Sequence, residues 1–248
     1  MATVEYSVNN SICYIALNRP EKRNAINRDM SDELDAAFVR AEADEEVKVI
    51  VLKANGPSFC SGYDLKQSYY LQGMKDGTAD WNYKSTTAIL KNIVEARYLR
   101  IWNCAKPTIA QVQGNALAAG CYLQLLCDIS VAAEDAVLGH PAMRWGGVSS
   151  MPLWQVVLGP KRARYLLFTG RTIDGKEAER IGLVSLAVPA DQLEQTVNQM
   201  AAEIAEIPSE GVIHQKEVLN TDLEIMGVGA MFRYHGCQND LGRFYRYR

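Results

Sequence analysis

Apolar residues follow two patterns in the first part of the chain, and each pattern predicts a different kind of element. Continuous apolar and β-branched runs occupy residues 12–17 and 49–54, which is typical of buried strands. Between them, apolar residues return every three or four positions, at Met30, Leu34, Phe38 and Ala41. That spacing predicts a helix. A strand, a helix and a second strand in this order favour parallel pairing and therefore an α/β fold.

The alternation of strands and helices continues along the chain. The apolar pattern predicts a helix marked by Leu90, Ile93, Val94, Tyr98 and Ile101, then a strand at 108–112, a short helix at 120–128 and a strand at 129–133. From Lys161 onward the pattern is helical, apart from one strand at 183–188. The polar stretch 68–85 predicts a loop beside the functional site. We expect a core over 1–190 and a helical C-terminal region over 191–248.

Composition and charge narrow the class of protein. With 248 residues, 48% of them hydrophobic, the chain can bury one large core. Its 26 basic and 29 acidic residues are interspersed, so no basic stripe indicates binding to nucleic acid or lipid. Neither a signal-peptide pattern nor an apolar run of about 20 residues occurs. We therefore expect a soluble, cytoplasmic protein that binds neither nucleic acid nor membranes.

Cysteine spacing bears on metal binding. The six cysteines are scattered, mostly within apolar segments, and form neither a C-x-x-C pair nor a zinc-type cluster with histidine. The sequence therefore predicts reduced core thiols and no metal site.

Two segments place small residues where a strand ends and a helix begins. They read FCSGYDLK at 59–66 and GNALAAGCYL at 114–123. The first amides of a helix have no intrahelical acceptor, and small residues let a ligand approach them. Two such ends facing one another would form an oxyanion hole. Each segment taken alone also has an ordinary interpretation, as a turn in the first case and as tight helix packing in the second.

Five segments in order resemble the crotonase, or enoyl-CoA hydratase/isomerase, superfamily. They are LNRPEKRNAI (17–26), FCSGYDLK, AKPTIAQVQGNALAAGC (105–121), CDISVAAEDAVLGHP (127–141) and LFTGRTIDGKEAERIGLVSLAV (167–188). The resemblance implies a ββα spiral core with a helical C-terminal trimerisation region. It also implies a homotrimer or homohexamer and an acyl-CoA thioester substrate. Coenzyme A would then enter as part of the substrate, with no tightly bound cofactor.

The resemblance also assigns main-chain and coenzyme contacts. It places the oxyanion donors on the backbone amides of Tyr63 and Ala119, and an alanine at 119 is tolerable there if its φ is negative. It places the backbone near Ala25 and Ile26 against the adenine. The cationic candidates for phosphate or ribose contacts, which could equally be solvated surface residues, are Lys22, Arg23 and Lys66.

The acid/base positions depart from the family pattern. Family hydratases use two glutamates, and the matching positions hold Tyr122 and Ala142. Tyr122 is either a proton donor or a core tyrosine that fills the vacated volume. His140 is either a base or a structural histidine. His235 resembles in placement a histidine of decarboxylating relatives, and Ser149 and Ser150 are candidate polar wall residues.

Three classes of function remain open on the sequence alone. The first is a lyase or isomerase that stabilises an enolate of a CoA thioester with non-standard acid/base residues. The second is an acyl-CoA decarboxylase or a hydrolase of C–C or thioester bonds. The third is a non-catalytic acyl-CoA-binding homologue. The two intact oxyanion segments favour the first two over the third.

Overall fold

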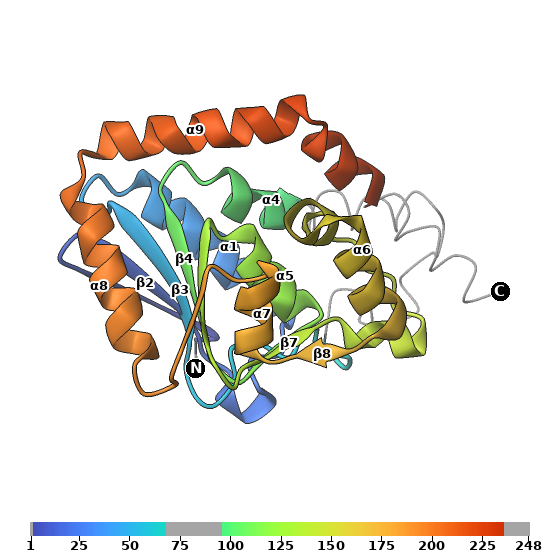
Figure 1. Ribbon diagram of the computed structural model, residues 1–248. Helices are drawn as coiled ribbons and strands as arrows, with labels where there is room; N and C mark the ends of the chain where they lie inside the picture. Colours follow the sequence, from blue (N-terminus) through green and yellow to red (C-terminus); the bar gives the residue numbers. More distant parts are fainter. Residues whose placement is uncertain (1, 68–95, 236–248) are drawn as a thin grey trace, which may run out of the picture.

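A six-stranded sheet forms the centre of the protein. The computed structural model describes residues 2–67 and 96–235 (Figure 1). In spatial order the strands are β1 (Val4–Asn9), β2 (Ile12–Leu17), β3 (Val49–Ala54), β4 (Thr108–Val112), β6 (Ile129–Ala133) and β9 (Leu186–Val188). β1 pairs antiparallel with β2, and every other pair in this sheet is parallel. The predicted α/β class and parallel pairing are confirmed.

Burial on both faces explains why the inner strands have continuous apolar runs. Residues 49–52 of β3 are completely buried, as expected for a parallel strand covered by helices on both sides. Helix α8 (Leu193–Glu206) packs against β2, β3, β4 and β6, while α1 (Arg28–Ala43) contacts β1 and β2. Figure 1 shows the sheet between these two helices.

A smaller sheet carries the segments that approach the functional site. It contains β5 (Asn115–Leu117), β7 (Val137–Gly139) and β8 (Thr172–Ile173) in the order β5-β7-β8. The sequence did not predict these strands, because two or three residues are too few to show a period. A bridge between Cys60 and Ala116 joins the segment after β3 to β5.

The other helices surround the second half of the chain. They are α4 (Ala96–Asn103), α5 (Ala119–Leu126), α6 (Leu153–Thr169), α7 (Gly175–Ile181) and α9 (Ser209–Ile225), with short 3-10 helices η1 (Pro20–Lys22) and η3 (Pro141–Trp145). Residues 228–235 are also helical. The predicted loop 68–85 and the first part of the helix predicted around Leu90 lie outside the described residues.

One predicted strand is shorter than its apolar run. The prediction covered 183–188, but β9 begins at Leu186. The amides of Leu183 and Val184 instead bond to the carbonyl of Ala178 and close the end of α7. Apolar character at 183 and 184 reflects burial beneath a helix end and not strand pairing.

A buried lysine attaches α9 to the core. Lys216 Nζ lies 2.7 Å from Asp128 Oδ2 and also donates to the carbonyl of Lys106. Asp128 in turn accepts from the amide and hydroxyl of Thr108 at the start of β4. The division at residue 190 stays a prediction. Helix α8, which lies beyond it, packs directly on the central sheet.

The described cysteines are all buried and unpaired, at Cys13, Cys60, Cys104, Cys121 and Cys127. Within residues 2–67 and 96–235, no helix is long and apolar enough to cross a bilayer.

Candidate active site

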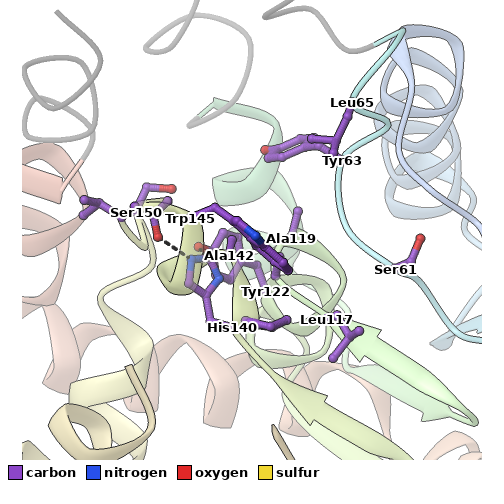
Figure 2. Close-up of a pocket in the computed structure, with 15 residues that line it drawn as sticks. Ser61, Tyr63, Leu65, Leu117, Ala119, Tyr122, His140, Ala142, Trp145 and Ser150 are labelled. Atoms are coloured by element: carbon purple, nitrogen blue, oxygen red, sulfur yellow. Dashed lines mark hydrogen bonds between the residues drawn. The ribbon is translucent and has the colours of Figure 1, made fainter. Parts of the chain in front are cut away.

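A cavity of about 520 Å³ lies where the two predicted small-residue segments meet. Figure 2 shows Ser61, Tyr63 and Leu65 on one side of it, and His140 and Ala142 with the segment that follows on the other. The described lining residues are Ser61, Tyr63, Leu65, Leu117, Ala118, Ala119, Tyr122, His140, Pro141, Ala142, Trp145, Gly146, Gly147, Val148 and Ser150. Apart from His140, none of these side chains is ionisable below the pKa range of tyrosine.

Close backbone approach holds the two segments together. A Cβ on Gly120, the second residue of α5, would lie 2.1 Å from the carbonyl oxygen of Cys60. A Cβ on Gly62 would lie 3.0 Å from the carbonyl oxygen of Leu117 and 3.6 Å from the amide nitrogen of Ala119. Both positions therefore need glycine, and the start of α5 rests directly on the loop before Tyr63.

Tyr63 and Ala119, which carry the two predicted donor amides, both line the cavity. The loop that carries Tyr63 is fixed on both sides, because Ile26 donates to the carbonyl of Gly62 and Asp64 donates to the carbonyl of Ile26. Ala119 is the first residue of α5, and the amide at that position has no acceptor within the helix. The two segments that carry the predicted donors therefore lie on the same cavity.

The preceding alanine has a backbone conformation that favours glycine. Ala118 has φ 50° and ψ −117°, while Ala119 is not among the residues with positive φ. The expected tolerance for alanine at 119 is therefore met. Backbone strain is located one residue earlier, and such a conformation costs about 1–3 kcal/mol.

Three polar side chains converge on the far wall of the cavity. Tyr122 Oη lies 3.2 Å from His140 Nδ1 and donates to Ser149 Oγ at 3.0 Å. The rings of Tyr122 and His140 stack with centroids 5.5 Å apart. Tyr98 of α4 presents its ring edge to Tyr122 and bonds through its hydroxyl to Tyr63. Tyr122 is thus packed in the core and hydrogen-bonded at its polar end.

His140 is held from its other side. Its Nε2 lies 3.1 Å from the carbonyl oxygen of Gly147. Burial lowers the pKa of His140 below the ordinary histidine value, although the bond to Gly147 acts in the opposite direction. The short helix η3 lies between the two residues and carries Ala142 and Trp145 to the cavity wall.

His235 lies beside this cluster but does not line the cavity. The pKa of its ring is lowered by burial and raised to a smaller extent by a hydrogen bond to the backbone of Ser149. The helical segment 228–235 therefore contacts the residue that accepts from Tyr122. Of the five predicted acid/base and oxyanion residues, four line one cavity: Tyr63, Ala119, Tyr122 and His140. His235 is connected to them through Ser149.

The predicted coenzyme residues lie on the outer side of the Tyr63 loop. Lys22, Arg23 and Lys66 are exposed, Ala25 is half-buried and Ile26 is buried. The Arg23 carbonyl accepts from the Ser61 amide. None of the five lines the cavity, but four of them are on the segment that pairs with the loop.

A buried arginine connects these two segments. Arg19 donates to the carbonyl of Ala25 and forms an ion pair with Asp64, Nη2 to Oδ2, at 3.1 Å. Burial acts to raise the pKa of the Asp64 carboxyl, but the Lys66 amide and Arg19 outweigh it and the pKa is lowered. The segment that carries Ala25 and the Tyr63 loop are therefore held together by an ion pair as well as by backbone pairing.

Several wall residues gave no sequence signal. Leu65, Trp145 and Val148 line the cavity although their side chains are largely exposed. Each is a single apolar residue outside the long helices and strands, without a period that would distinguish it from an incidental surface residue. Ser149, named from the sequence only as a wall residue, is the direct partner of Tyr122.

Comparisons with known proteins agree with this arrangement. The sequence model described as enoyl-CoA hydratase/isomerase matches residues 7–233. The chain is 35% identical over 242 residues to EchA13 of Mycobacterium tuberculosis, whose name classes it with the enoyl-CoA hydratases; the match covers 91% of this chain and 74% of that protein.

Two solved structures have the same fold over nearly the whole chain. An enoyl-CoA hydratase/isomerase from Xanthobacter autotrophicus is similar with a TM-score of 0.89 and 32% identity, covering 97% of this chain and 87% of that one. An enoyl-CoA hydratase from Mycobacterium smegmatis is similar with a TM-score of 0.88 and 32% identity, covering 97% and 84%.

Proposed function

The chain belongs to the enoyl-CoA hydratase/isomerase family, and from that premise we propose that it is a lyase or isomerase acting on an acyl-CoA thioester through a stabilised enolate. The observation that carries the proposal is the close approach of the Tyr63 loop to the start of α5. That approach brings Tyr63 and Ala119 to one cavity, and we propose that a thioester oxygen bound there accepts from both of their backbone amides. Each donor of such a pair contributes roughly 3–4 kcal/mol to stabilising a developing oxyanion.

The coenzyme is assigned to the outer side of the same loop. The backbone near Ala25 and Ile26 would face the adenine, and Lys22, Arg23 and Lys66 are exposed cations that could reach phosphate groups. Arg19 supports this assignment, because its bonds to Ala25 and Asp64 hold the coenzyme segment in register with the oxyanion loop.

The acyl group is proposed to be apolar. Leu65, Leu117, Trp145 and Val148 are among the residues that supply hydrocarbon surface to the cavity. Burying such a group contributes about 25 cal/mol per Å² of apolar surface. We expect medium-length or aromatic acyl thioesters to bind more tightly than malonyl- or succinyl-CoA.

Binding experiments test the coenzyme assignment directly. Calorimetry with an apolar acyl-CoA and with its parent free acid should show binding of the thioester and much weaker binding of the acid. Lys66→Ala should weaken the thioester only, with Lys176→Ala, remote from this loop and paired with Glu134, as the control. Equal affinity for thioester and acid, or no binding of either, would contradict the assignment.

Ordinary hydration is expected to be slow. A phenol at 122 and a methyl group at 142 replace the two carboxylates that family hydratases use, and losing a positioned general base costs roughly 10²- to 10⁴-fold. Crotonyl-CoA should therefore be hydrated poorly, and Tyr122→Glu combined with Ala142→Glu should raise the rate. Efficient hydration by the unmodified chain would show that another carboxylate acts. Product masses from an acyl-CoA panel separate isomerase or lyase activity from decarboxylation and hydrolysis.

A further inference from the structure

The hydrogen bond at Nε2 of His140 determines which ring nitrogen carries a hydrogen. Nε2 lies 3.1 Å from the Gly147 carbonyl oxygen, which can only accept, so Nε2 carries a hydrogen. Burial disfavours the charged ring and lowers the pKa of His140. In the neutral ring the Nε2 hydrogen is the only one, and Nδ1 is then an acceptor.

The phenol of Tyr122 therefore has two hydrogen-bond arrangements. Its oxygen is 3.2 Å from His140 Nδ1 and 3.0 Å from Ser149 Oγ. When His140 is neutral, Nδ1 can accept the phenol hydrogen. When His140 is protonated, its Nδ1 hydrogen donates to the phenol oxygen, and the phenol hydrogen turns toward Ser149 or a ligand. The direction of the bond reverses with the charge of the histidine.

We propose that Tyr122 and His140 act as a single acid/base pair, in which the phenol oxygen exchanges the proton with the bound ligand and the imidazole stores it. The proposal rests on the proposed function, since it assigns the proton transfer within the same cavity. Both side chains line that cavity, and both are almost completely buried.

The proton balance of the pair is complete. In the forward step a C–H or O–H bond of the ligand breaks, and its proton moves to Tyr122 Oη. At the same time the phenol O–H bond breaks, and that proton moves to Nδ1 of His140. The ligand keeps the electron pair as an enolate or alkoxide, His140 becomes imidazolium and Tyr122 ends as a neutral phenol. The reverse transfer returns one proton to the ligand and restores the neutral ring.

Pairing with His140 compensates for the low basicity of an isolated phenol. A tyrosine with its ordinary pKa of about 10 is a poor base at neutral pH. With His140 as the final acceptor, the relevant pKa is that of the imidazole, which burial lowers from the ordinary histidine value but which is far below that of a phenol. Ser149 is a positioning residue here, because it bonds the phenol oxygen from the side opposite His140 and its own backbone contacts His235.

The surrounding groups do not fix the charge of His140 by ion pairing. Among the described residues, the titratable groups of this cluster are Tyr122 on α5, Tyr98 on α4 and Tyr63 on the facing loop, together with His235 on 228–235. Arg144 of η3 lies against Gly170. Across the described ranges, no salt bridge joins His140 to a carboxylate. Burial and the Gly147 bond therefore set its protonation.

The test uses hydrogen exchange at the α-carbon of a bound acyl-CoA in D₂O, followed by mass spectrometry. Tyr122→Phe and His140→Gln should each slow exchange at least about 100-fold. The double variant should be no slower than the worse single variant, because residues that act as one unit are not additive. His214→Gln is the matched control, since that histidine is exposed on α9. Calorimetry confirms that each variant still binds the thioester.

The pH dependence of the exchange rate distinguishes an acid/base role of His140 from a purely structural one. The chain has three histidines, so ¹⁵N NMR with single substitutions can assign His140 and its protonated nitrogen. The exchange rate should fall as the pH drops through the NMR pKa of His140, and Ser149→Ala should displace that midpoint while retaining binding. In His140→Gln the acid limb at that pH should disappear.

Each contrary outcome has a separate meaning. Absence of thioester binding would overturn the proposed function. Binding without exchange in the unmodified chain would overturn the acid/base pair. The pair is also overturned if the effects of the two single substitutions multiply in the double variant, or if NMR finds Nδ1 protonated in neutral His140.

Discussion

Ala118 shows how a single residue carries strain for the sake of the site. Its positive φ lets the chain turn from β5 into α5 at the point where Ala119, the residue of the proposed donor amide, reaches the cavity. Glycine adopts this conformation without a Cβ penalty, although it also increases the freedom of the unfolded chain. Ala118→Gly should therefore raise the free energy of unfolding by about 1 kcal/mol in urea titrations.

The neighbouring residue supplies the control for this prediction. Ala119 lies in the helix, so Ala119→Gly should lower the free energy of unfolding by up to about 1 kcal/mol. The same chemical change at adjacent positions should thus have opposite signs. Destabilisation at both positions would argue against strain at Ala118.

For single residues, the sequence predicted which positions belong to the site better than which side chains contact one another. Small residues at 61–62 and 118–120 indicated the oxyanion segments, and the structure places them together. Tyr122 and His140 were named as separate candidates, yet their side chains contact one another directly although they are 18 positions apart in the sequence. No spacing rule predicts such a pair, because it depends on the turn from α5 through β6 and β7 to η3.

Helix α5 depends on one glycine for its position against the Cys60 loop. A methyl group at Gly120 would overlap the Cys60 carbonyl, so Gly120→Ala should move the helix start away from Tyr63. We expect a loss of about 3 kcal/mol in unfolding free energy, together with weakened thioester binding.

Gly211 is the matched glycine in another helix. Nothing lies within 4 Å of a Cβ placed there, so Gly211→Ala in α9 should stabilise the chain by about 0.5–1 kcal/mol. Calorimetric unfolding and acyl-CoA titration of both variants check the pair. Normal binding by Gly120→Ala would show that the spacing of the two amides tolerates movement.

Elements with long apolar runs were the predictable part of the fold. The strands at 12–17, 49–54, 108–112 and 129–133 have the expected bounds, because burial on both faces makes most of their residues apolar and the runs are easily recognised. The short strands of the second sheet were not predictable. Their pairing is decided by long-range contacts such as the bridge between Cys60 and Ala116.

The whole molecule exposes apolar side chains that a single chain does not cover. Phe168, Ile225 and Met226 are each more than 70% exposed, whereas Val228 is buried. Exposed apolar surface of this kind favours self-association. The homotrimer or homohexamer stays a prediction that light scattering can check.

The expected result is a mass near a multiple of three chains of 27.6 kDa. Ile225→Glu with Met226→Glu should shift the distribution toward smaller species, while Lys176→Glu, on the exposed surface of α7, should not. A clean monomer for the unmodified chain would contradict the prediction.

Cys60 and Cys121 flank the two cavity amides, and neither thiol reaches solvent. Burial raises the pKa of each to about 12, so neither is a thiolate at neutral pH. Peroxide and alkylating reagents attack the thiolate. Both thiols are therefore expected to be inert to such reagents in the folded chain. Labelling of either thiol would report that the chain has opened between α5 and the Cys60 loop.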